Sequence, residues 1–423
     1  MSLPQRSARA LAGLSLRPGF LRPTIGIVVL VVVAIVSVEL LMGKLPFVTT
    51  TGGGGGAVGP RITPTPSGVV VVPVDPRSKV PGEIVYVKDG NLWIQSGANV
   101  AQFTTTGNDA MPSFSADGAW IYFIQTHQAS GQFACGGLSA GYALSVPAIM
   151  RIPANGSGSA QQLKSGAFSQ GGSNWFYFLR QPVPNPAGTR LALVSDAPQP
   201  CGEDVVLQFL SLTTKQLSQV GVPESPPLGH QDPAWSPDGS SLLYVRNERD
   251  GARGAPVIYR YALASKTVTR VTGPGYLQPS FSPDGRYIAV THLDTVGSDI
   301  VILDANNGHE LARVTTDDAS TAPVWSPAGD AIAYLHVTGG VADLEMVTLS
   351  GNAPNWTISD PIAMTQNAGL DPGSRPSWFI PAAQLPSPAP SQTSPAPSAA
   401  SSAPAGSPLP ATGSPSAPAS GAP

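Results

Sequence analysis

Polar and titratable side chains recur at one position of a repeated sequence pattern, thirteen residues after the proline that opens each copy. This position holds Gln125, Ser195, Arg246, His292 and His336 in successive copies. His230 and Asp232 lie just before the proline of the third copy. Imidazole, guanidinium and carboxylate groups gathered at one rim could bind a polar ligand or move protons. Strand ends near solvent are often polar, so plain solvation of these side chains is the alternative interpretation.

The spacings that mark common metal sites do not occur in the sequence. It has no His-x-His, His-Glu-x-x-His or Cys-x-x-Cys segment. The glycine run at 52–56 is not followed by Lys and Ser or Thr, so it does not fit a phosphate-binding loop. A net charge of −3 with 12% charged residues offers no basic surface for nucleic acid. We therefore expect no metal ion, no cofactor and no nucleic-acid partner.

The repeated pattern is a hairpin that opens with proline, an aromatic residue and a tight turn. Full copies begin at residue 112 (PSFSADGAWIYF), 182 (PVPNPAGTRLAL), 233 (PAWSPDGSSLLY), 279 (PSFSPDGRYIAV) and 323 (PVWSPAGDAIAY), and a truncated copy, PSWF, begins at 376. The starts are 44 to 70 residues apart. A period of roughly 40 to 50 residues with several strands per unit is typical of the blades of a β-propeller.

Each part of the pattern has a structural reason. Asp-Gly pairs such as Asp284-Gly285 suit a tight hairpin turn, because Gly reaches positive φ and Asp accepts backbone hydrogen bonds. The aromatic residue at the third place is expected to wedge between neighbouring blades. Residues 257–272 and 299–315 read as a further hairpin in their units. Four strands per unit follow.

The two ends of the repeat region complement each other. The sixth copy stops at Phe379, before its second strand, whereas residues 82–107 contain three strands without a first one. We expect these segments to share one blade, which removes the exposed sheet edges and places Asp89 at the rim position described above. The predicted fold is all-β: a six-bladed β-propeller with four-stranded blades over residues 82–380, closed by pairing of N- and C-terminal strands.

The proline, aromatic and Ser-Pro-Asp-Gly hairpin resembles the TolB-type propeller repeats, which are related to WD-repeat propellers. The resemblance covers about residues 82–380 and implies the fold rather than a function. It also implies a bacterial source. The family's additional α/β domain has no room between Gly43 and Gly82, and no serine hydrolase domain follows as in similar oligopeptidases.

The ends of the chain differ from the repeat region. Residues 24–43 form an almost unbroken apolar run, preceded by arginines at 6, 9, 17 and 22, which predicts a retained transmembrane signal anchor with residues 1–23 in the cytoplasm. A cleaved signal peptide is the alternative. Residues 44–81 read as a flexible Gly/Pro linker and 381–423 as a disordered Pro/Ala/Ser-rich tail. The propeller is then expected on the outer side of the bacterial cytoplasmic membrane.

Two cysteines lie in corresponding loops of neighbouring units. Cys135 lies in the long segment 126–147, between the second and third strands of the first unit, and Cys201 lies in the matching segment of the next unit. Both loops are expected on the same face of the ring. In an oxidising compartment we expect a disulfide between Cys135 and Cys201, with two free thiols as the alternative.

These features favour a non-enzymatic binding or scaffold module, tethered to the membrane, for a protein or a cell-envelope glycan. The candidate ligand-binding residues are Gln125, His230, Asp232, Arg246, His292 and His336. A propeller lyase or hydrolase that uses Arg246, His292 and His336 on a polysaccharide is the alternative from the enzyme class. A structural element of a larger secretion or sensory complex differs from the first hypothesis only in its partner.

Overall fold

The computed structural model describes residues 74–132, 141–170, 172–197, 205–224, 229–249, 253–351 and 353–385. The apolar run at 24–43, both cysteines, and the tail from residue 386 onward lie outside this part of the chain. No helix within the described ranges is long and apolar enough to cross a membrane. Anchoring and the Cys135–Cys201 disulfide therefore remain predictions.

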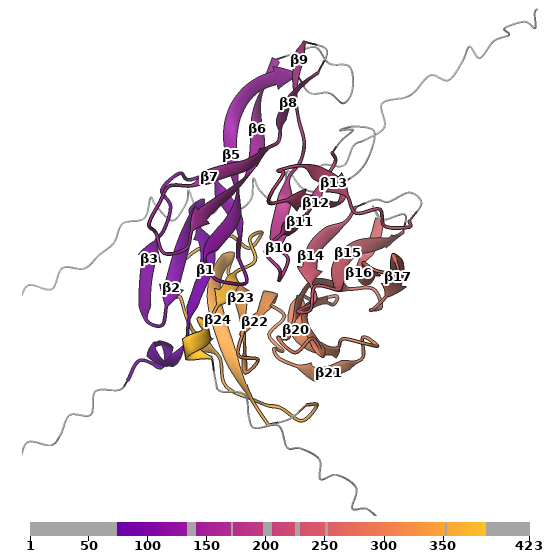
Figure 1. The fold of residues 1–423 in the computed structure, drawn as a ribbon. Helices are drawn as coiled ribbons and strands as arrows, with labels where there is room; N and C mark the ends of the chain where they lie inside the picture. Colours follow the sequence, from indigo (N-terminus) through magenta and orange to yellow (C-terminus); the bar gives the residue numbers. More distant parts are fainter. Residues whose placement is uncertain are drawn as a thin grey trace, which may run out of the picture. The chain divides into compact units, whose positions relative to one another are not determined.

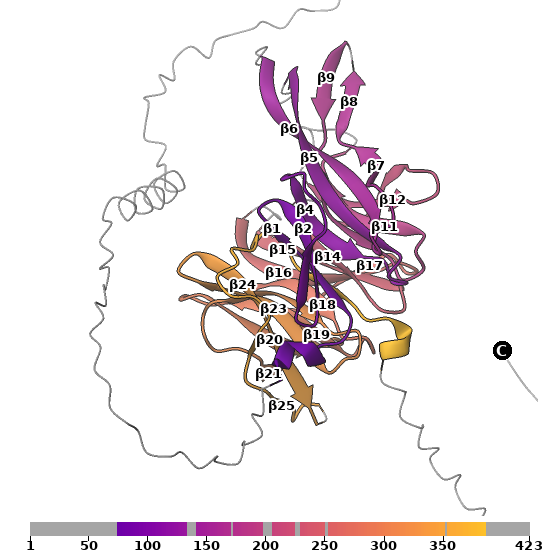
Figure 2. The ribbon, with the colours of Figure 1, turned by 90° about the vertical axis from the view of Figure 1, so that its left-hand side faces the viewer.

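The described residues form an all-β propeller of six blades, each a sheet of at least four strands (Figures 1 and 2). Five blades follow one another along the chain: β4 (Asp109–Phe114), β5 (Trp120–Gln132), β6 (Gly141–Pro153) and β7 (Gln161–Ser165); β10 (Arg180–Pro184), β11 (Arg190–Ser195), β12 (Val206–Ser211) and β13 (Leu217–Gln219); β14 (Gln231–Trp235), β15 (Ser241–Arg249), β16 (Arg253–Ala262) and β17 (Thr267–Arg270); β18 (Tyr276–Phe281), β19 (Tyr287–Leu293), β20 (Ser298–Asp304) and β21 (Glu310–Arg313); β22 (Ser320–Trp325), β23 (Ala331–Thr338), β24 (Val341–Ser350), β25 (Thr357–Ile358) and β26 (Ile362–Ala363). All pairings within the blades are antiparallel. The first strand of each blade is innermost, and consecutive inner strands contact each other around the axis.

The sixth blade is built from both ends of the repeat region, as the sequence predicts. Strand β27 (Ser377–Phe379) pairs with β1 (Glu83–Lys88), which continues into β2 (Asn91–Ser96) and β3 (Asn99–Gln102). Ile84 lies opposite Trp378 in this sheet. Tyr86 and Trp378 share one hydrophobic cluster with the fifth blade. This pairing gives the sixth blade its inner strand and closes the ring of blades.

In the five motifs that have an aromatic residue at the third place, this residue packs between blades, which confirms the wedge interpretation. Trp235 stacks on Phe209 of the preceding blade with ring centroids 5.5 Å apart, and its indole N–H donates to the Val183 carbonyl at 3.1 Å. Trp325 packs in the same way against Ile300 and other core residues of the blade before it. Because these rings are buried between two sheets, they hold neighbouring blades together.

The Asp-Gly turns also form as predicted. Gly239 has a φ of +70°, and the Asp238 carboxylate accepts from the Ser236 hydroxyl at 2.6 Å and from the Ser240 backbone N–H at 3.0 Å. These hydrogen bonds lower the pKa of Asp238 to about 2. The outer hairpins turn at Lys266 and at Gly308, both with positive φ and both within the ranges that the sequence predicts as hairpins.

Three segments differ from the sequence analysis. The segment 126–147, expected as a loop, extends the hairpin strands instead: β5 continues to Gln132 and β6 begins at Gly141. An extra hairpin, β8 (Ala167–Gln170) and β9 (Ser173–Phe176), lies between the first two blades and pairs with no blade, and it accounts for part of the long first interval. Residues 76–80, expected within the linker, instead form the 3₁₀ helix η1 (Pro76–Lys79) and the buried Val80.

Candidate functional site

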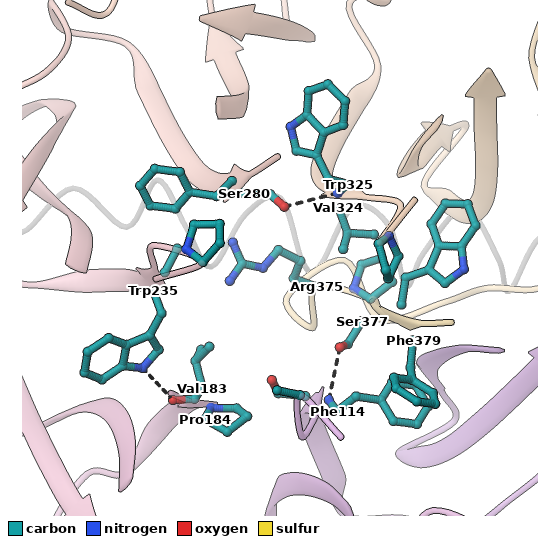
Figure 3. A pocket seen from close by; sticks show the side chains of 18 of the residues that line it. Phe114, Val183, Pro184, Trp235, Ser280, Val324, Trp325, Arg375, Ser377 and Phe379 are labelled. Atoms are coloured by element: carbon teal, nitrogen blue, oxygen red, sulfur yellow. Dashed lines mark hydrogen bonds between the residues drawn. The ribbon is translucent and has the colours of Figure 1, made fainter. Parts of the chain in front are cut away.

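A cavity of about 510 Å³ lies on the propeller axis, on the side of the proline-containing turns. The motif segments of all six blades line it, so the same repeat positions contribute a floor, a wall and a mouth. Figure 3 shows these segments arranged around the Arg375 side chain. The cavity is lined by the inner strands and their turns, because the second strand of each blade lies farther from the axis.

The floor consists of the residues that immediately precede the motif prolines, except Ala322 of the fifth blade, which does not line the cavity. Five of these residues are left-handed, with φ between 51° and 56°: Met111, Gln181, Asp232, Gln278 and Ala322. Each lies at a β-bulge, where the register of the inner strand shifts. Proline has no N–H for the ladder, and the bulge turns the N–H of the preceding residue out of its own sheet.

These freed N–H groups connect one blade to the next, and we call the connections the axial belt. The N–H of Asp232 donates to Gln181 Oε1 at 2.8 Å, and Gln181 Nε2 donates back to Asp232 Oδ1 at 2.6 Å. The same backbone link recurs at Gln278 to Asp232 Oδ2 (3.2 Å), Ala322 to Gln278 Oε1 (2.9 Å), Gln181 to Met111 Sδ (3.3 Å) and Met111 to Ser374 Oγ (3.0 Å). The belt therefore joins five of the six blade junctions.

The missing link lies between the fifth and sixth blades, because the Ala322 side chain offers no acceptor. Arg375 occupies the position before the proline of the sixth blade. Its guanidinium reaches across the axis instead, and donates to the carbonyl of Pro279 at 2.7 Å and of Pro233 at 3.5 Å. A cation from the sixth blade thus lies between the third and fourth blades, in the middle of the cavity (Figure 3).

Burial shifts the pKa of each of the two charged groups at the floor, Arg375 and Asp232. It lowers the pKa of Arg375, although the Asp232 charge counteracts this effect. It raises the pKa of Asp232, against the opposing influence of Arg375 and of the hydrogen bonds from Gln278 and Gln181. Both Asp232 oxygens are used by the belt. The floor therefore holds a guanidinium and a carboxylate that face the same space without a direct ion pair between them.

The wall is formed by the residue after each motif proline. Three blades present hydroxyl groups there (Ser113, Ser280 and Ser377), and three present apolar side chains (Val183, Ala234 and Val324). Two hydroxyl oxygens also join blades: Ser280 Oγ accepts from the Trp325 N–H at 3.2 Å, and Ser377 Oγ accepts from the Phe114 N–H at 3.1 Å (Figure 3). The wall is thus partly polar and partly apolar.

The mouth is a ring of turn residues. Pro186, Pro237, Pro283 and Pro327 line it, and the first three are exposed. The rings of Pro186, Pro237 and Pro283 lie close to the turn glycine of the following blade, at 3.5 to 3.7 Å from where a Cβ would stand. The sixth blade has no such turn, and Phe379 fills the corresponding space beside Gly118. An apolar mouth above a polar floor suits a ligand that has both apolar and polar groups.

The sequence-predicted residues divide between this cavity and the opposite rim. Asp232 lies in the inner strand β14 and lines the cavity. Six other residues of the predicted rim do not line the cavity. They lie within second strands (Gln125, Arg246, His292 and His336), at the end of a second strand (Ser195) and in the turn after β1 (Asp89). Several second strands run past the predicted position, so these residues are not all at strand ends.

His230 and Arg246 are brought together by a residue that the sequence analysis did not single out, Glu224. Glu224 Oε2 lies 3.0 Å from His230 Nε2 and 2.7 Å from Arg246, while the Tyr244 hydroxyl donates to Oε1. The side chains of His230 and Glu224 are only 1% and 7% exposed. Burial raises the pKa of Glu224, but the hydrogen bonds from His230 and Tyr244 and the Arg246 charge outweigh it and leave the pKa below its ordinary value. This cluster links the third blade, through Arg246 and Tyr244 of β15, to Glu224 in the segment that precedes the blade.

The other rim residues have separate local partners. His292 stacks on Tyr276 with centroids 4.4 Å apart. His336 Nε2 lies 2.6 Å from the Thr338 hydroxyl, and its Nδ1 lies 3.3 Å from Asp317. Gln125 donates to Asp109 at 2.8 Å. These contacts explain the polar residues as parts of individual blades.

One group of carboxylates has the spacing of a cation site. Oxygens of Asp294, Asp299 and Asp318 lie within 4.8 Å of one another. However, Asp299 Oδ1 accepts from the backbone N–H groups of residues 317 and 318, and Oδ2 pairs with Arg313 at 2.8 Å. The loop therefore already uses the central carboxylate.

Comparisons with known proteins agree with the fold. A family model described as the TolB beta propeller domain matches residues 159–361. The "Tol-Pal system protein TolB" of Hydrogenovibrio crunogenus is 35% identical over 74 residues, which are 18% of this chain and 17% of that protein. The protein of the same name from Francisella tularensis is 35% identical over 78 residues, or 18% of each chain. The matched part is thus about a sixth of these relatives' length.

A solved structure extends the likeness to most of the ring. The crystal structure of TolB from Acinetobacter baumannii is similar with a TM-score of 0.50 over 70% of this chain and 66% of that one. The sequence identity is 18%, so this likeness concerns the fold.

Proposed function

We propose that this TolB-like β-propeller protein is a binding module whose axial cavity receives a segment of another protein. The observation that carries the proposal is the cavity itself: about 510 Å³, lined by all six blades, with an apolar mouth and a charged floor. This volume suits a few side chains rather than a whole domain. The relatives named as Tol-Pal system proteins add support, because that name denotes a system of several components.

The module would work outside the cytoplasm, held by the apolar segment 24–43 through the linker that follows it. A tether favours a binding role, because it raises the local concentration of the module near other envelope components. A cell-envelope glycan is the competing ligand class, and the experiment below separates it from a protein.

Site-specific photo-crosslinking in the native host tests the proposal. A photoreactive residue at Ala116, which is exposed at the cavity mouth, is compared with one at Val296, which is 78% exposed in the loop between β19 and β20 at the opposite ends of the strands. We expect a discrete protein adduct from position 116 and none from position 296. Equal labelling at both positions, or no protein adduct at 116, contradicts the proposal.

A further inference from the structure

The Arg375 side chain brings unused hydrogen-bond donors to the axial cavity. The Arg375 guanidinium has five N–H groups. Its described partners are the two carbonyl oxygens of Pro279 and Pro233, the second at the long distance of 3.5 Å. No carboxylate in the described part of the chain forms an ion pair with Arg375. The guanidinium therefore keeps unused hydrogen-bond donors, and its positive charge has no ion-pair partner among the described residues of the cavity.

The side-chain oxygens around Arg375 already accept hydrogen bonds within the protein. Asp232 is the carboxylate whose charge acts on Arg375, and its two oxygens accept one hydrogen bond each, from Gln181 and from Gln278. Ser280 Oγ and Ser377 Oγ each accept a backbone N–H, so their hydroxyl hydrogens remain free to donate. The unused donors of Arg375 and of these two hydroxyl groups therefore favour a ligand that supplies acceptor oxygens.

We infer that Arg375 is the receptor for a carboxylate group of the bound protein segment, with the cavity hydroxyls as additional donors. The inference rests on the proposed function and specifies the ligand chemistry of the same cavity. A guanidinium fork matches the two oxygens of a carboxylate, and hydrogen bonds between charged groups are shorter and stronger than neutral ones. The carboxylate comes either from an Asp or Glu side chain or from a chain terminus of the partner, and the exposed prolines at the mouth would contact the apolar residues that flank it.

Saturation-transfer NMR on the full-length protein tests this with small probes. N-acetylproline carries a terminal carboxylate and an apolar ring, and N-acetylprolinamide is its neutral counterpart. N-acetylaspartate α-methylamide carries a side-chain carboxylate instead. We expect at least one acid to bind about tenfold more tightly than N-acetylprolinamide, the factor associated with a charge-assisted hydrogen bond. The stronger acid identifies the source of the carboxylate.

Variants assign the preference to Arg375. Arg375→Gln should abolish the preference for the acids, Arg375→Lys should retain part of it because the positive charge remains, and the control His292→Ala should leave it unchanged. If Arg375→Gln does not fold, the acid-to-amide ratio of the wild type and the Arg375→Lys result still decide.

Equal affinity for acids and amide in the wild type overturns the inference, as does an undiminished preference in Arg375→Gln. Either result is distinguishable from failure of the proposed function, because the crosslink at position 116 would still form.

Discussion

The axial belt predicts that one glutamine contributes strongly to the stability of the ring. Gln181 and Asp232 exchange two hydrogen bonds across the junction of the second and third blades, at 2.8 and 2.6 Å, and one of them reaches a buried carboxylate. Gln181→Leu leaves the Asp232 N–H and one carboxylate oxygen without these partners. A neutral hydrogen bond contributes about 0.5–1.5 kcal/mol and one to a charged group about 1.5–3 kcal/mol, so the expected loss is about 2–4.5 kcal/mol.

The equivalent residue of the first blade provides a matched control. Met111 Sδ accepts one weak bond, at 3.3 Å, from the Gln181 N–H. Met111→Leu keeps the volume and removes only that bond, so it should cost less than about 1.5 kcal/mol. Thermal unfolding followed by circular dichroism and by tryptophan fluorescence measures both, and the two signals must coincide for the comparison to hold. At about 2–4 °C per kcal/mol, Gln181→Leu should lower Tm by at least about 4 °C. A Tm no lower than that of Met111→Leu would refute the belt as a stabilising element.

Two further predictions concern the turns and the rim. Gly118→Ala should destabilise the protein more than Gly188→Ala. Both glycines have φ near +65°, a conformation that costs about 1–2 kcal/mol for alanine. Only at position 118 would the new Cβ lie 2.1 Å from the Phe379 ring, and this clash should add about 1–3 kcal/mol. Equal Tm values for the two variants would show that Phe379 yields freely. Glu224→Gln should be less stable than the wild type near neutral pH. The pKa of Glu224 is lowered in the folded protein, so the stability advantage of the wild type is fully present above the unfolded pKa of about 4.3. This advantage disappears as the pH falls through the pKa of Glu224 in the folded protein. Urea unfolding at pH 5.5 and pH 3, at constant salt, measures this, and a pH-independent difference would contradict the charge-based account.

The sequence predicts the architecture because the features that define it repeat in residue type. Proline, an aromatic residue and Asp-Gly recur, and each is tied to a local conformation or to packing between blades. The complementary ends of the repeat region likewise predict the closing blade around Trp378. The extra hairpin β8–β9 carries no motif, and the long strands β5 and β6 run through Gly- and Ser-rich sequence that reads as a loop, so neither could be predicted.

The cavity was missed for a related reason. Its floor residues share a position, directly before the motif proline, but not a residue type, since this position holds Met, Gln, Asp, Gln, Ala and Arg in order around the ring. The titratable residues that recur among the copies lie in the second strand or at its end, whereas the innermost strand surrounds the axis. Among the predicted residues only Asp232 lies there. A polar residue before four of the six motif prolines was the available signal.

Ring closure and the charged floor depend on the same short segment. Ser374 accepts the belt hydrogen bond from Met111, Arg375 delivers the cation to the axis, and Trp378 packs into the core of the closing blade. Because these residues are consecutive with β27, separating β27 from β1 would remove a belt link and the proposed carboxylate receptor together. A ligand held by Arg375 would bind the closed ring and not the opened one, and would therefore stabilise closure by mass action. Under the proposed function, an incompletely closed propeller would bind no partner through this cavity.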